Sequence, residues 1–400
     1  MTRVGFLFNH DAAHQVMHAA PVAFEMAQRY PEIDIHVLVT TEAEADAVAE
    51  LARSYPQSPL RTRRIEPPAA ARRLDRVTGN AFLLKRIGVL RRYRRLFADF
   101  DMLVVPDKTS LFLKRWLGAD CPLLGYICHG AGDRAGSLRG DESFDICLLP
   151  GRKYETRIRE GGRLPPERYA VVGYPKLDIY RTAPRPRLFE DDKPVVLYTP
   201  HFHPKLSSWF GWGRGILEYF AANPDYNLIF APHVLLFRRR WHIPTQGGLP
   251  RRTPPVPDAI RRASNILVDL GSRASIDMTY LRAADIYLGD VSSQVYEFIY
   301  RPRPCLFLNA SGAEWWNDPH FRLWTLGDVL GALEDLPAAL DRAVAEPNRY
   351  RSEQERAFAE AFDLTEQPSA LRAAEALAGY LRREGRLDGS AAHVSIGATG

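Results

Sequence analysis

The residues with the clearest chemical potential are two adjacent serines, Ser292 and Ser293. They follow the apolar run Ile286–Leu288 and the pair Gly289-Asp290, and a helical pattern begins directly after them. Two small hydroxyl residues between a strand and a helix predict an anion site, because hydroxyls and free backbone N–H groups converge there. We therefore expect Ser292, Ser293 and Asp290 to bind a phosphate. The alternative is a structural role in which a serine only caps the helix.

A carboxylate lies one helical turn beyond the serines. Glu297 follows Ser293 by four residues, and residues with that spacing share one face of a helix. We expect Glu297 to reach a ribose hydroxyl, next to a pyrophosphate or a transferring phosphoryl group on the serines.

His129 and Gly130 follow another apolar run, Leu123–Cys128. A histidine at the carboxyl end of a strand can act as a general base near neutral pH. A glycine beside it allows a ligand to approach the backbone closely. The pair therefore predicts a catalytic base at His129 and a phosphate contact at Gly130. A structural loop histidine is the alternative.

Three further histidines follow predicted strands. His233 ends the run Asn227–Ala231, and His201 and His203 end the run Val195–Thr199. At a strand end His233 can donate a hydrogen bond to a phosphate oxygen or protonate a leaving group. The His201-x-His203 pair lacks an obvious acidic or cysteine partner, so we expect contact with the donor or acceptor and no metal site.

The side that receives the transferred group is predicted from two other segments. Asn9, His10 and His14 follow the first strand, and Asp178 lies in the motif Gly173–Asp178 at a domain junction. We expect these residues on the acceptor side. For Asp178, the cap of a helix is the alternative.

Short apolar runs that alternate with helical patterns predict the elements that position these residues. Such runs occur at residues 4–8, 33–40, 102–106, 123–128, 146–150 and 169–172, and again from residue 195 to residue 308. This arrangement is typical of parallel sheets covered on both faces. Since open parallel sheets bind ligands at their carboxyl ends, two such domains facing each other would form one cleft.

The domain boundaries follow from composition. Residues 181–194 are rich in proline and charge and predict an interdomain linker. We expect one domain over 1–178, a linker over 179–194 and a second domain over 195–362. A C-terminal helix over 363–385 and a disordered tail over 386–400 complete the prediction.

The segment Leu83–Phe97 is strongly basic and carries apolar residues at helical spacing. Such a helix can lie on an anionic membrane surface. The arginines assigned to that contact are Arg91, Arg92, Arg94 and Arg95. The alternative is a surface helix whose apolar stripe packs in the core. No nucleic-acid module accompanies the charge, so we expect no nucleic-acid partner.

Composition favours a soluble globular protein of the cytoplasm. The four cysteines, Cys121, Cys128, Cys147 and Cys305, lie in or beside apolar runs without CxxC spacing. They predict buried free thiols in a reducing compartment. No run reaches the roughly 20 apolar residues of a membrane span, and the N-terminus does not resemble a signal peptide.

Four islands together resemble the CDP-glycerol glycerophosphotransferase family of teichoic-acid type polymerases and primases. They are Gly125–Gly132, Val171–Tyr180, Lys193–Pro204 and Tyr280–Phe307, in the family's order. The resemblance implies a GT-B-like fold: two Rossmann-like α/β domains facing across a cleft, followed by C-terminal helices. It makes the domain over 1–178 the acceptor-side domain and the domain over 195–362 the nucleotide-donor domain. It also implies no metal or other cofactor, His129 as the base on the acceptor hydroxyl, and His233 and the two serines at the phosphates.

The expected reaction moves glycerol phosphate from CDP-glycerol to a polyol-phosphate or glycan acceptor and releases CMP. The options left open include a lipid-linked acceptor and peripheral contact of the protein with the inner face of the membrane. Two rivals stay open. One is glycosyl transfer from a nucleotide sugar on the same fold, with sugar 2-epimerisation as a variant. The other is a catalytically degenerate binding or scaffold protein, since His201-Phe202-His203 and the His129 island depart from the family's pattern.

Overall fold

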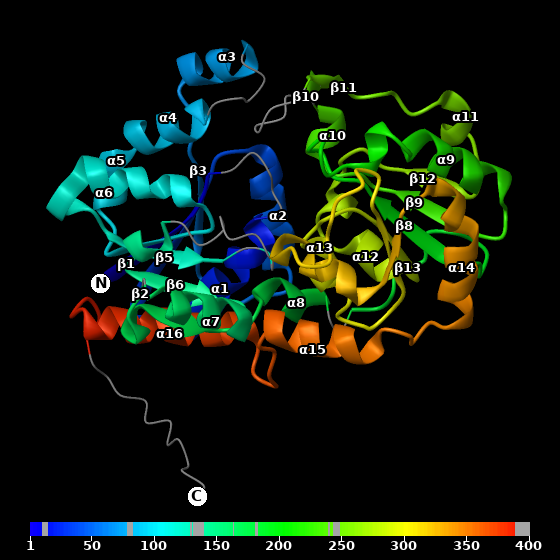
Figure 1. The fold of residues 1–400 in the computed structure, drawn as a ribbon. Helices are drawn as coiled ribbons and strands as arrows, with labels where there is room; N and C mark the ends of the chain where they lie inside the picture. The colour runs from blue at the N-terminus through cyan, green and yellow to red at the C-terminus, as the bar shows by residue number, and fades with distance from the viewer. Residues whose placement is uncertain are drawn as a thin grey trace, which may run out of the picture.

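Two parallel β-sheets, each covered by helices, lie side by side in the protein (Figure 1). The computed structural model describes residues 1–9, 15–77, 83–128, 130, 140–162, 164–180, 183–238, 241–242 and 249–388. The two sheets confirm the predicted α/β class with two Rossmann-like halves. We call these the N-terminal half and the C-terminal half.

The sheet of the N-terminal half has seven parallel strands in the order β3-β2-β1-β4-β5-β6-β7. The strands are β1 (Thr2–Phe8), β2 (Ile33–Val39), β3 (Arg61–Arg64), β4 (Met102–Val105), β5 (Leu123–Ile127), β6 (Ile146–Leu149) and β7 (Tyr169–Val171). Alternate residues of β4 enter different cores: Met102 and Val104 on one face, Leu103 and Val105 on the other. The sheet is therefore buried on both faces, as the apolar runs predict.

The sheet of the C-terminal half has six parallel strands in the order β12-β9-β8-β13-β14-β15. They are β8 (Val195–Thr199), β9 (Asn227–Phe230), β12 (Ile266–Val268), β13 (Ile286–Gly289), β14 (Cys305–Leu308) and β15 (Asp328–Leu330). A small antiparallel pair, β10 (Trp241–His242) and β11 (Arg251–Arg252), lies apart from it. The order of the main sheet is that of a doubly wound fold, with the switch point between β8 and β13.

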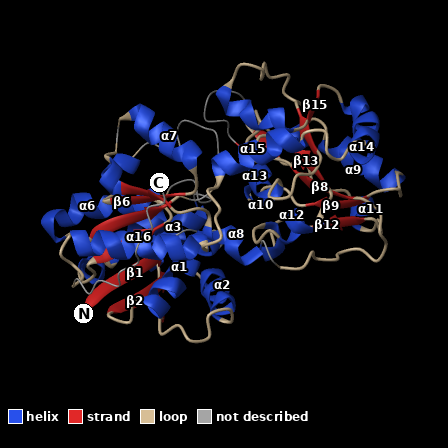
Figure 2. Ribbon diagram, turned by 90° about the horizontal axis from the view of Figure 1, so that it is seen from below, coloured by secondary structure: helices blue, strands red, loops and turns tan. Residues whose placement is uncertain are grey.

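Helices cover both sheets. Those of the N-terminal half are α1 (Val16–Arg29), α2 (Glu42–Ala52), α3 (Ala69–Val77), α4 (Leu84–Arg92), α5 (Arg94–Ala98), α6 (Phe112–Leu117), α7 (Arg152–Gly161) and α8 (Pro175–Tyr180). Those that follow are α9 (Gly213–Ala222), α10 (Leu235–Arg238), α11 (Asp258–Arg261), α12 (Thr279–Ala283), α13 (Gln294–Phe298), α14 (Leu336–Ala345), α15 (Arg351–Ala361) and α16 (Ser369–Arg383). Helix α8 lies at the junction between the halves (Figure 2).

The last helix returns to the first sheet. Helix α16 runs beneath the N-terminal half (Figure 1), and Ala373, Leu377 and Leu381 are buried in the same core as β1 and α1. This helix therefore crosses from the C-terminal half and completes the N-terminal core.

Some elements differ from the expectation. The basic segment is broken at Tyr93 into α4 and α5. Strand β3 was not predicted, because its sequence Arg-Thr-Arg-Arg is exposed at the sheet edge and is held by backbone pairing to β2. Strand β15 (Asp328–Leu330) lies beyond the apolar runs that were predicted as strands, the last of which ends at residue 308.

Two other expectations concern membrane spans and cysteines. Across the part of the chain that the structure describes, every helix is too short or too polar to cross a bilayer.

All four cysteines are described and all are free thiols. Cys128, Cys147 and Cys305 are buried as predicted, and Cys121 is half-buried. Burial raises the pKa of the Cys128 thiol to about 12, so this group stays protonated.

Candidate functional site

The serine turn, Ser292 and Ser293, lies directly beyond β13 at the switch point of the C-terminal sheet. Both side chains are half-buried, and the Ser292 Oγ accepts a 3.3 Å hydrogen bond from the Gln294 N–H. Helix α13, which follows, has only five residues. Its dipole is therefore short, and the hydroxyls and backbone amides are the groups that can bind an anion.

The N-terminal half approaches this turn through Gly130, just beyond β5. A Cβ atom added at Gly130 would lie 3.5 Å from the Ser293 Oγ, and its backbone φ of +81° favours glycine. The Gly130 carbonyl accepts a 2.9 Å hydrogen bond from the Tyr154 hydroxyl of α7. The strand ends of both sheets therefore meet, as the prediction of one cleft requires. His129, His10 and His14 lie outside the described residues, so their predicted roles stay predictions.

Asp290 is placed beneath the turn, with a side chain that is 0% exposed. Its Oδ2 accepts hydrogen bonds from the backbone N–H groups of His201 (2.7 Å) and Ser208 (3.0 Å). Its Oδ1 has no hydrogen-bond partner among the described residues. Burial raises the pKa of Asp290 to about 7, because desolvation disfavours the charged carboxylate. Asp290 thus ties the loop after β8 to the turn. Its phosphate contact stays a prediction.

Three histidines of the C-terminal half share one hydrogen-bond pattern. The Nδ1 of His201 accepts from the His203 N–H (2.9 Å), that of His203 from the Lys205 N–H (3.3 Å), and that of His233 from the Leu235 N–H (3.2 Å). An Nδ1 that accepts cannot carry the proton of a neutral ring, so the proton lies on Nε2. The rings of His201 and His233 are 5.7 Å apart, and the Phe202 ring lies 4.6 Å from each.

The His233 side chain is exposed to solvent, although protein atoms surround much of its ring. Desolvation lowers the pKa of His233 to about 4, because a charged ring is poorly stabilised there. At neutral pH the ring is therefore a neutral Nε2–H donor. Of the two roles predicted for His233, this favours hydrogen bonding to an oxygen over protonation of a leaving group.

Glu297 faces the domain junction. Its Oε1 accepts a 2.7 Å hydrogen bond from the Tyr174 hydroxyl, and its Oε2 lies 2.7 Å from the Lys176 Nζ. Both oxygens are thus occupied by residues of the Gly173–Asp178 motif. The predicted ribose contact would require one of these bonds to be replaced, and it stays a prediction.

The predicted acceptor side is described in part. Asn9 is 2% exposed, and its side-chain amide donates a 3.1 Å hydrogen bond to the Arg86 carbonyl. It lines a pocket of about 270 Å³ at the carboxyl ends of β1, β2 and β3. The Asp178 carboxylate accepts from the Ala370 N–H (2.8 Å) and so caps α16, which is the alternative that the sequence left open.

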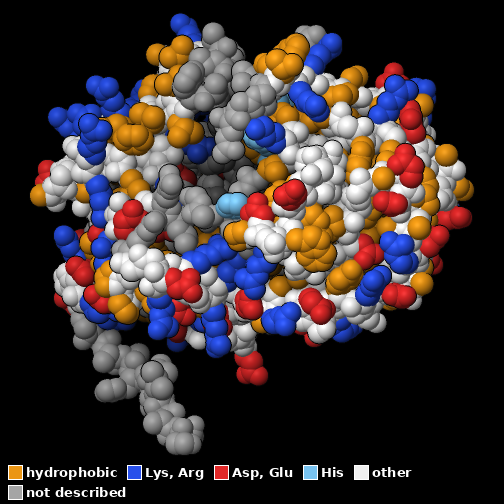
Figure 3. All heavy atoms as spheres, viewed as in Figure 1, with side chains coloured by type: hydrophobic (Ala, Val, Ile, Leu, Met, Phe, Trp, Pro, Cys, Tyr) orange, Lys and Arg blue, Asp and Glu red, His pale blue; other side chains and the backbone are white. Residues whose placement is uncertain are grey.

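A larger pocket that the sequence reasoning did not identify lies between the halves. It measures about 770 Å³ and is bounded by α1 and α2 on one side and by the ends of β9 and β12 on the other. Its polar lining groups include Asp46, Ser272, Arg273 and Asp277. The signal that was missed is the Gly271-Ser272-Arg273 segment, which begins three residues after Val268, the end of β12. Space-filling atoms show the molecule hollowed between the halves (Figure 3).

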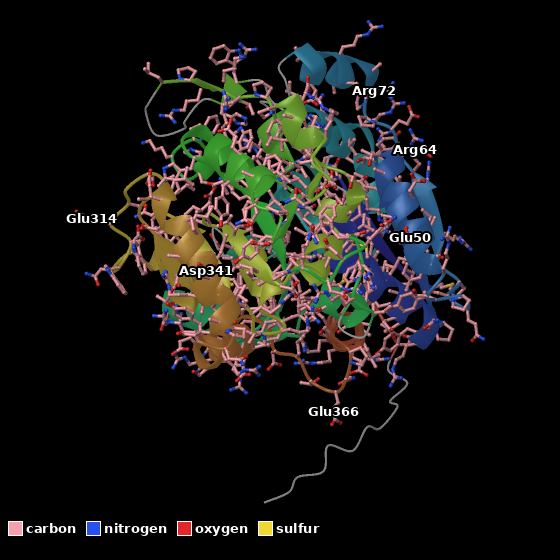
Figure 4. All side chains as sticks on the ribbon, turned by 90° about the vertical axis from the view of Figure 1, so that its right-hand side faces the viewer. Glu50, Arg64, Arg72, Glu314, Asp341 and Glu366 are labelled. Atoms are coloured by element: carbon pink, nitrogen blue, oxygen red, sulfur yellow. The ribbon has the colours of Figure 1, made fainter. Side chains whose placement is uncertain are left out.

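The basic segment forms an outlying corner of the N-terminal half. Arg91, Arg92, Arg94 and Arg95 are all exposed. Basic side chains gather at this corner (Figure 3), and Arg64 and Arg72 extend it from β3 and α3 (Figure 4). Much of the apolar stripe packs inward, since Val89, Leu90 and Phe97 are buried, whereas Leu74 and Leu83 are about half exposed. Membrane contact stays a prediction.

Comparisons with known proteins support the fold. No family model matches the sequence, and no curated protein matches it. Solved structures do match. The wall teichoic acid polymerase TagF has a TM-score of 0.60 at 12% identity, covering 96% of this chain and 90% of that one. A UDP-GlcNAc 2-epimerase from Neisseria meningitidis bound to UDP-GlcNAc has a TM-score of 0.58 at 14% identity, covering 96% and 99%. MnaA of S. aureus with UDP has a TM-score of 0.54 at 12% identity, covering 97% and 98%. At these identities the likeness shows a GT-B-like fold.

Proposed function

We propose that the protein is a transferase of cell-surface polymer synthesis that moves glycerol phosphate from CDP-glycerol to an acceptor hydroxyl. The observation that carries the proposal is the approach of Gly130 in the N-terminal half to Ser293 in the C-terminal half. A diphosphate seated on the serine turn would therefore lie within reach of residues from both sheets. The resemblance of four sequence islands to glycerophosphotransferases, and the likeness of fold to TagF, support this choice of donor.

In the proposed reaction the acceptor hydroxyl attacks the β-phosphorus of CDP-glycerol. His129 takes the hydroxyl proton, a new P–O bond forms, and the bond between the β-phosphorus and the bridging oxygen breaks. CMP leaves with the electron pair. Positioning and electrostatic stabilisation supply most of the catalysis in phosphoryl transfer, so the site needs few reactive groups.

The charges around the turn suit an anionic donor. His233 would donate its Nε2–H to a phosphate oxygen, and the two serine hydroxyls would donate as well. Asp290, whose pKa is raised to about 7 by burial, is partly protonated at neutral pH. It therefore repels a diphosphate less than an ordinary carboxylate would. The bonding of His201 and His203 through Nδ1 also leaves the proton on Nε2, which disfavours a metal on that nitrogen.

The nucleoside of the donor would occupy the pocket of about 770 Å³ beside β9 and β12. Ligands of open α/β sheets bind at carboxyl strand ends. For the acceptor we propose a polyol phosphate or glycan, lipid-linked where the arginines of α4 and α5 meet an anionic membrane at its inner face.

A second candidate is glycosyl transfer or sugar 2-epimerisation. It is favoured by the epimerase of similar fold that binds UDP-GlcNAc. The same serine turn would then hold the pyrophosphate, but the chemistry would occur on the sugar ring.

Product analysis separates the candidates. The purified protein is incubated with CDP-glycerol and a glycerol-phosphate oligomer as the acceptor, or with UDP-GlcNAc, and the released nucleotide is identified by chromatography. We expect CMP release that is lost in the Ser292→Ala/Ser293→Ala double variant and unchanged in Ser352→Ala, an exposed serine of α15. UDP release or an epimerised sugar would move the assignment to the second candidate. Absence of any turnover would favour the scaffold protein and overturn the proposal.

A further inference from the structure

The contact between Glu297 and the domain junction joins two features that the proposed function leaves separate. Glu297 lies on α13, directly behind the serine turn, and its partners Tyr174 and Lys176 lie more than 120 positions earlier in the chain. The side chains of Lys176 and Glu297 are only 6% and 8% exposed. A buried ion pair is costly to separate, because each charge would be left without its partner in a poorly solvating interior.

The partners of Glu297 contact both halves at the junction, and Tyr174 is buried in a core with residues of the C-terminal half. The Tyr174 ring stacks on Phe362 at 4.4 Å and meets the His18 ring of α1 edge-on at 5.0 Å. Lys176 lies on α8, which packs against α1 and α16. Glu297 is therefore held by a segment that packs against both halves.

A second contact acts on the same helix. The Lys153 ammonium of α7 lies 4.0 Å from the centre of the Tyr296 ring. The next residue on α7, Tyr154, bonds the Gly130 carbonyl, and Gly130 faces Ser293. Helix α13 is thus held from two sides by the half that carries the predicted base.

We propose that Lys176 and Tyr174 are positioning residues of the donor site. They hold Glu297, and through α13 they hold the serine turn in the geometry that binds the donor phosphates. The inference rests on the proposed function for the identity of the ligand. Its consequence is that donor affinity depends on contact between the halves, since separating α8 from α13 would release the turn.

The first test needs no ligand. Hydrogen exchange of the backbone amides of residues 292–300 is compared in the wild type, Lys176→Met and Lys176→Arg. These amides include the hydrogen-bonded N–H groups of Val295, Tyr296 and Ile299. We expect exchange to be about tenfold faster in Lys176→Met, which corresponds to about 1.4 kcal/mol, with recovery in Lys176→Arg. Unchanged exchange in Lys176→Met would overturn the proposal.

The second test measures the affinity for CDP-glycerol and, where turnover is found, the donor KM and kcat. We expect Lys176→Met to raise the Kd and donor KM about tenfold with little change in kcat, Tyr174→Phe to act in the same direction, and Lys176→Arg to restore both constants. Arg372→Met, which breaks a more exposed ion pair with Asp363 (side chains 17% and 25% exposed) away from α13, should lower stability and leave the donor constants unchanged. Equal effects of Arg372→Met and Lys176→Met would show a general loss of stability and contradict the positioning role.

A wild type that binds no CDP-glycerol would contradict the proposed function, while the exchange experiment would still decide whether Lys176 positions the turn.

Discussion

Two buried carboxylates flank the serine turn, and their surroundings differ. Asp290, before the turn, accepts hydrogen bonds from the backbone N–H groups of His201 and Ser208 in its own half. Glu297, after the turn, binds a lysine and a tyrosine at the domain junction. Among the residues that the structure describes, the first environment offers no cation that shifts this carboxyl, and burial raises the pKa of Asp290 to about 7. The second offers a cation at 2.7 Å.

The difference separates two tasks. Asp290 shapes the donor site from within the C-terminal half, because it fixes the loop that carries His201 and Ser208. Glu297 connects that site to the N-terminal half. One carboxylate therefore gives local order, and the other gives a contact that domain separation would break.

The largest expected effect concerns the protonation of Asp290. The unfolded carboxyl loses its proton near pH 4, whereas the folded one keeps it until about pH 7. The folded state binds more protons in this window, so stability falls as pH rises through it. The free energy of unfolding of the wild type should therefore fall by about 4 kcal/mol between pH 4 and 7, and Asp290→Asn should abolish this fall, as measured by urea unfolding. Asp341→Asn, an exposed carboxyl on α14 (Figure 4), is the control. If the free energy of unfolding depends on pH equally in Asp290→Asn and in the wild type, Asp290 is ionised like an ordinary carboxylate.

The arginines of α4 and α5 contrast with the two buried carboxylates, because their side chains are exposed and their charges are solvated. Replacing Arg91, Arg92, Arg94 and Arg95 with Gln should weaken co-sedimentation with phosphatidylglycerol vesicles at least tenfold, because each cation near an anionic surface contributes about 1 kcal/mol. Binding to phosphatidylcholine vesicles is the control and should be weak in both proteins. Retention of binding by the quadruple variant would refute membrane contact through these residues.

A substitution at Gly130 can reduce the space beside the serine turn while Asp290 and Glu297 stay unchanged. Gly130→Ala would add a Cβ 3.5 Å from the Ser293 Oγ. We expect about tenfold weaker donor binding and a loss of stability of about 1 kcal/mol from the positive φ. Gly140→Ala is matched in backbone strain, with a φ of +86°, but its nearest neighbour is Leu111. It should lose similar stability and keep donor affinity. Equal affinities in the two variants would place Gly130 outside the donor site.

The smallest expected effect concerns His233. Its contribution to stability rises with pH, whereas that of Asp290 falls. The lowered pKa of His233, about 4, means that the folded ring stays neutral while the unfolded ring takes up a proton near pH 6.5. Stability from this group is therefore present above pH 6.5 and is lost as pH falls toward 4. Titration of labelled histidines by NMR should show a neutral Nε2–H ring at pH 6. Proton uptake by His233 near pH 6.5 would contradict this.

The sequence predicts the general layout of the site because parallel sheets gather their carboxyl ends. Ser292, His201 and His233 were each placed after an apolar run, and the structure brings those strand ends together. Both sheets follow from the same pattern of short apolar runs.

The sequence does not predict partners that are distant along the chain. The bond between Glu297 and Lys176 depends on how α8 docks against α13, and no local spacing encodes that. The same holds for α16, whose apolar face fits either half by periodicity but packs on the first sheet. The polar edge strand β3 was missed because its four residues are polar and exposed, so no apolar run marks it.

Calorimetric titration with CDP-glycerol tests the central claim, that the serine turn is the phosphate site of the donor. We predict binding by the wild type that is about a hundredfold weaker in the Ser292→Ala/Ser293→Ala double variant, since each lost hydrogen bond to a charged phosphate costs about 1.5–3 kcal/mol. UDP-GlcNAc, titrated in parallel, should bind more weakly than CDP-glycerol. Equal binding of CDP-glycerol by the wild type and the double variant would contradict the account, because the donor would then sit elsewhere.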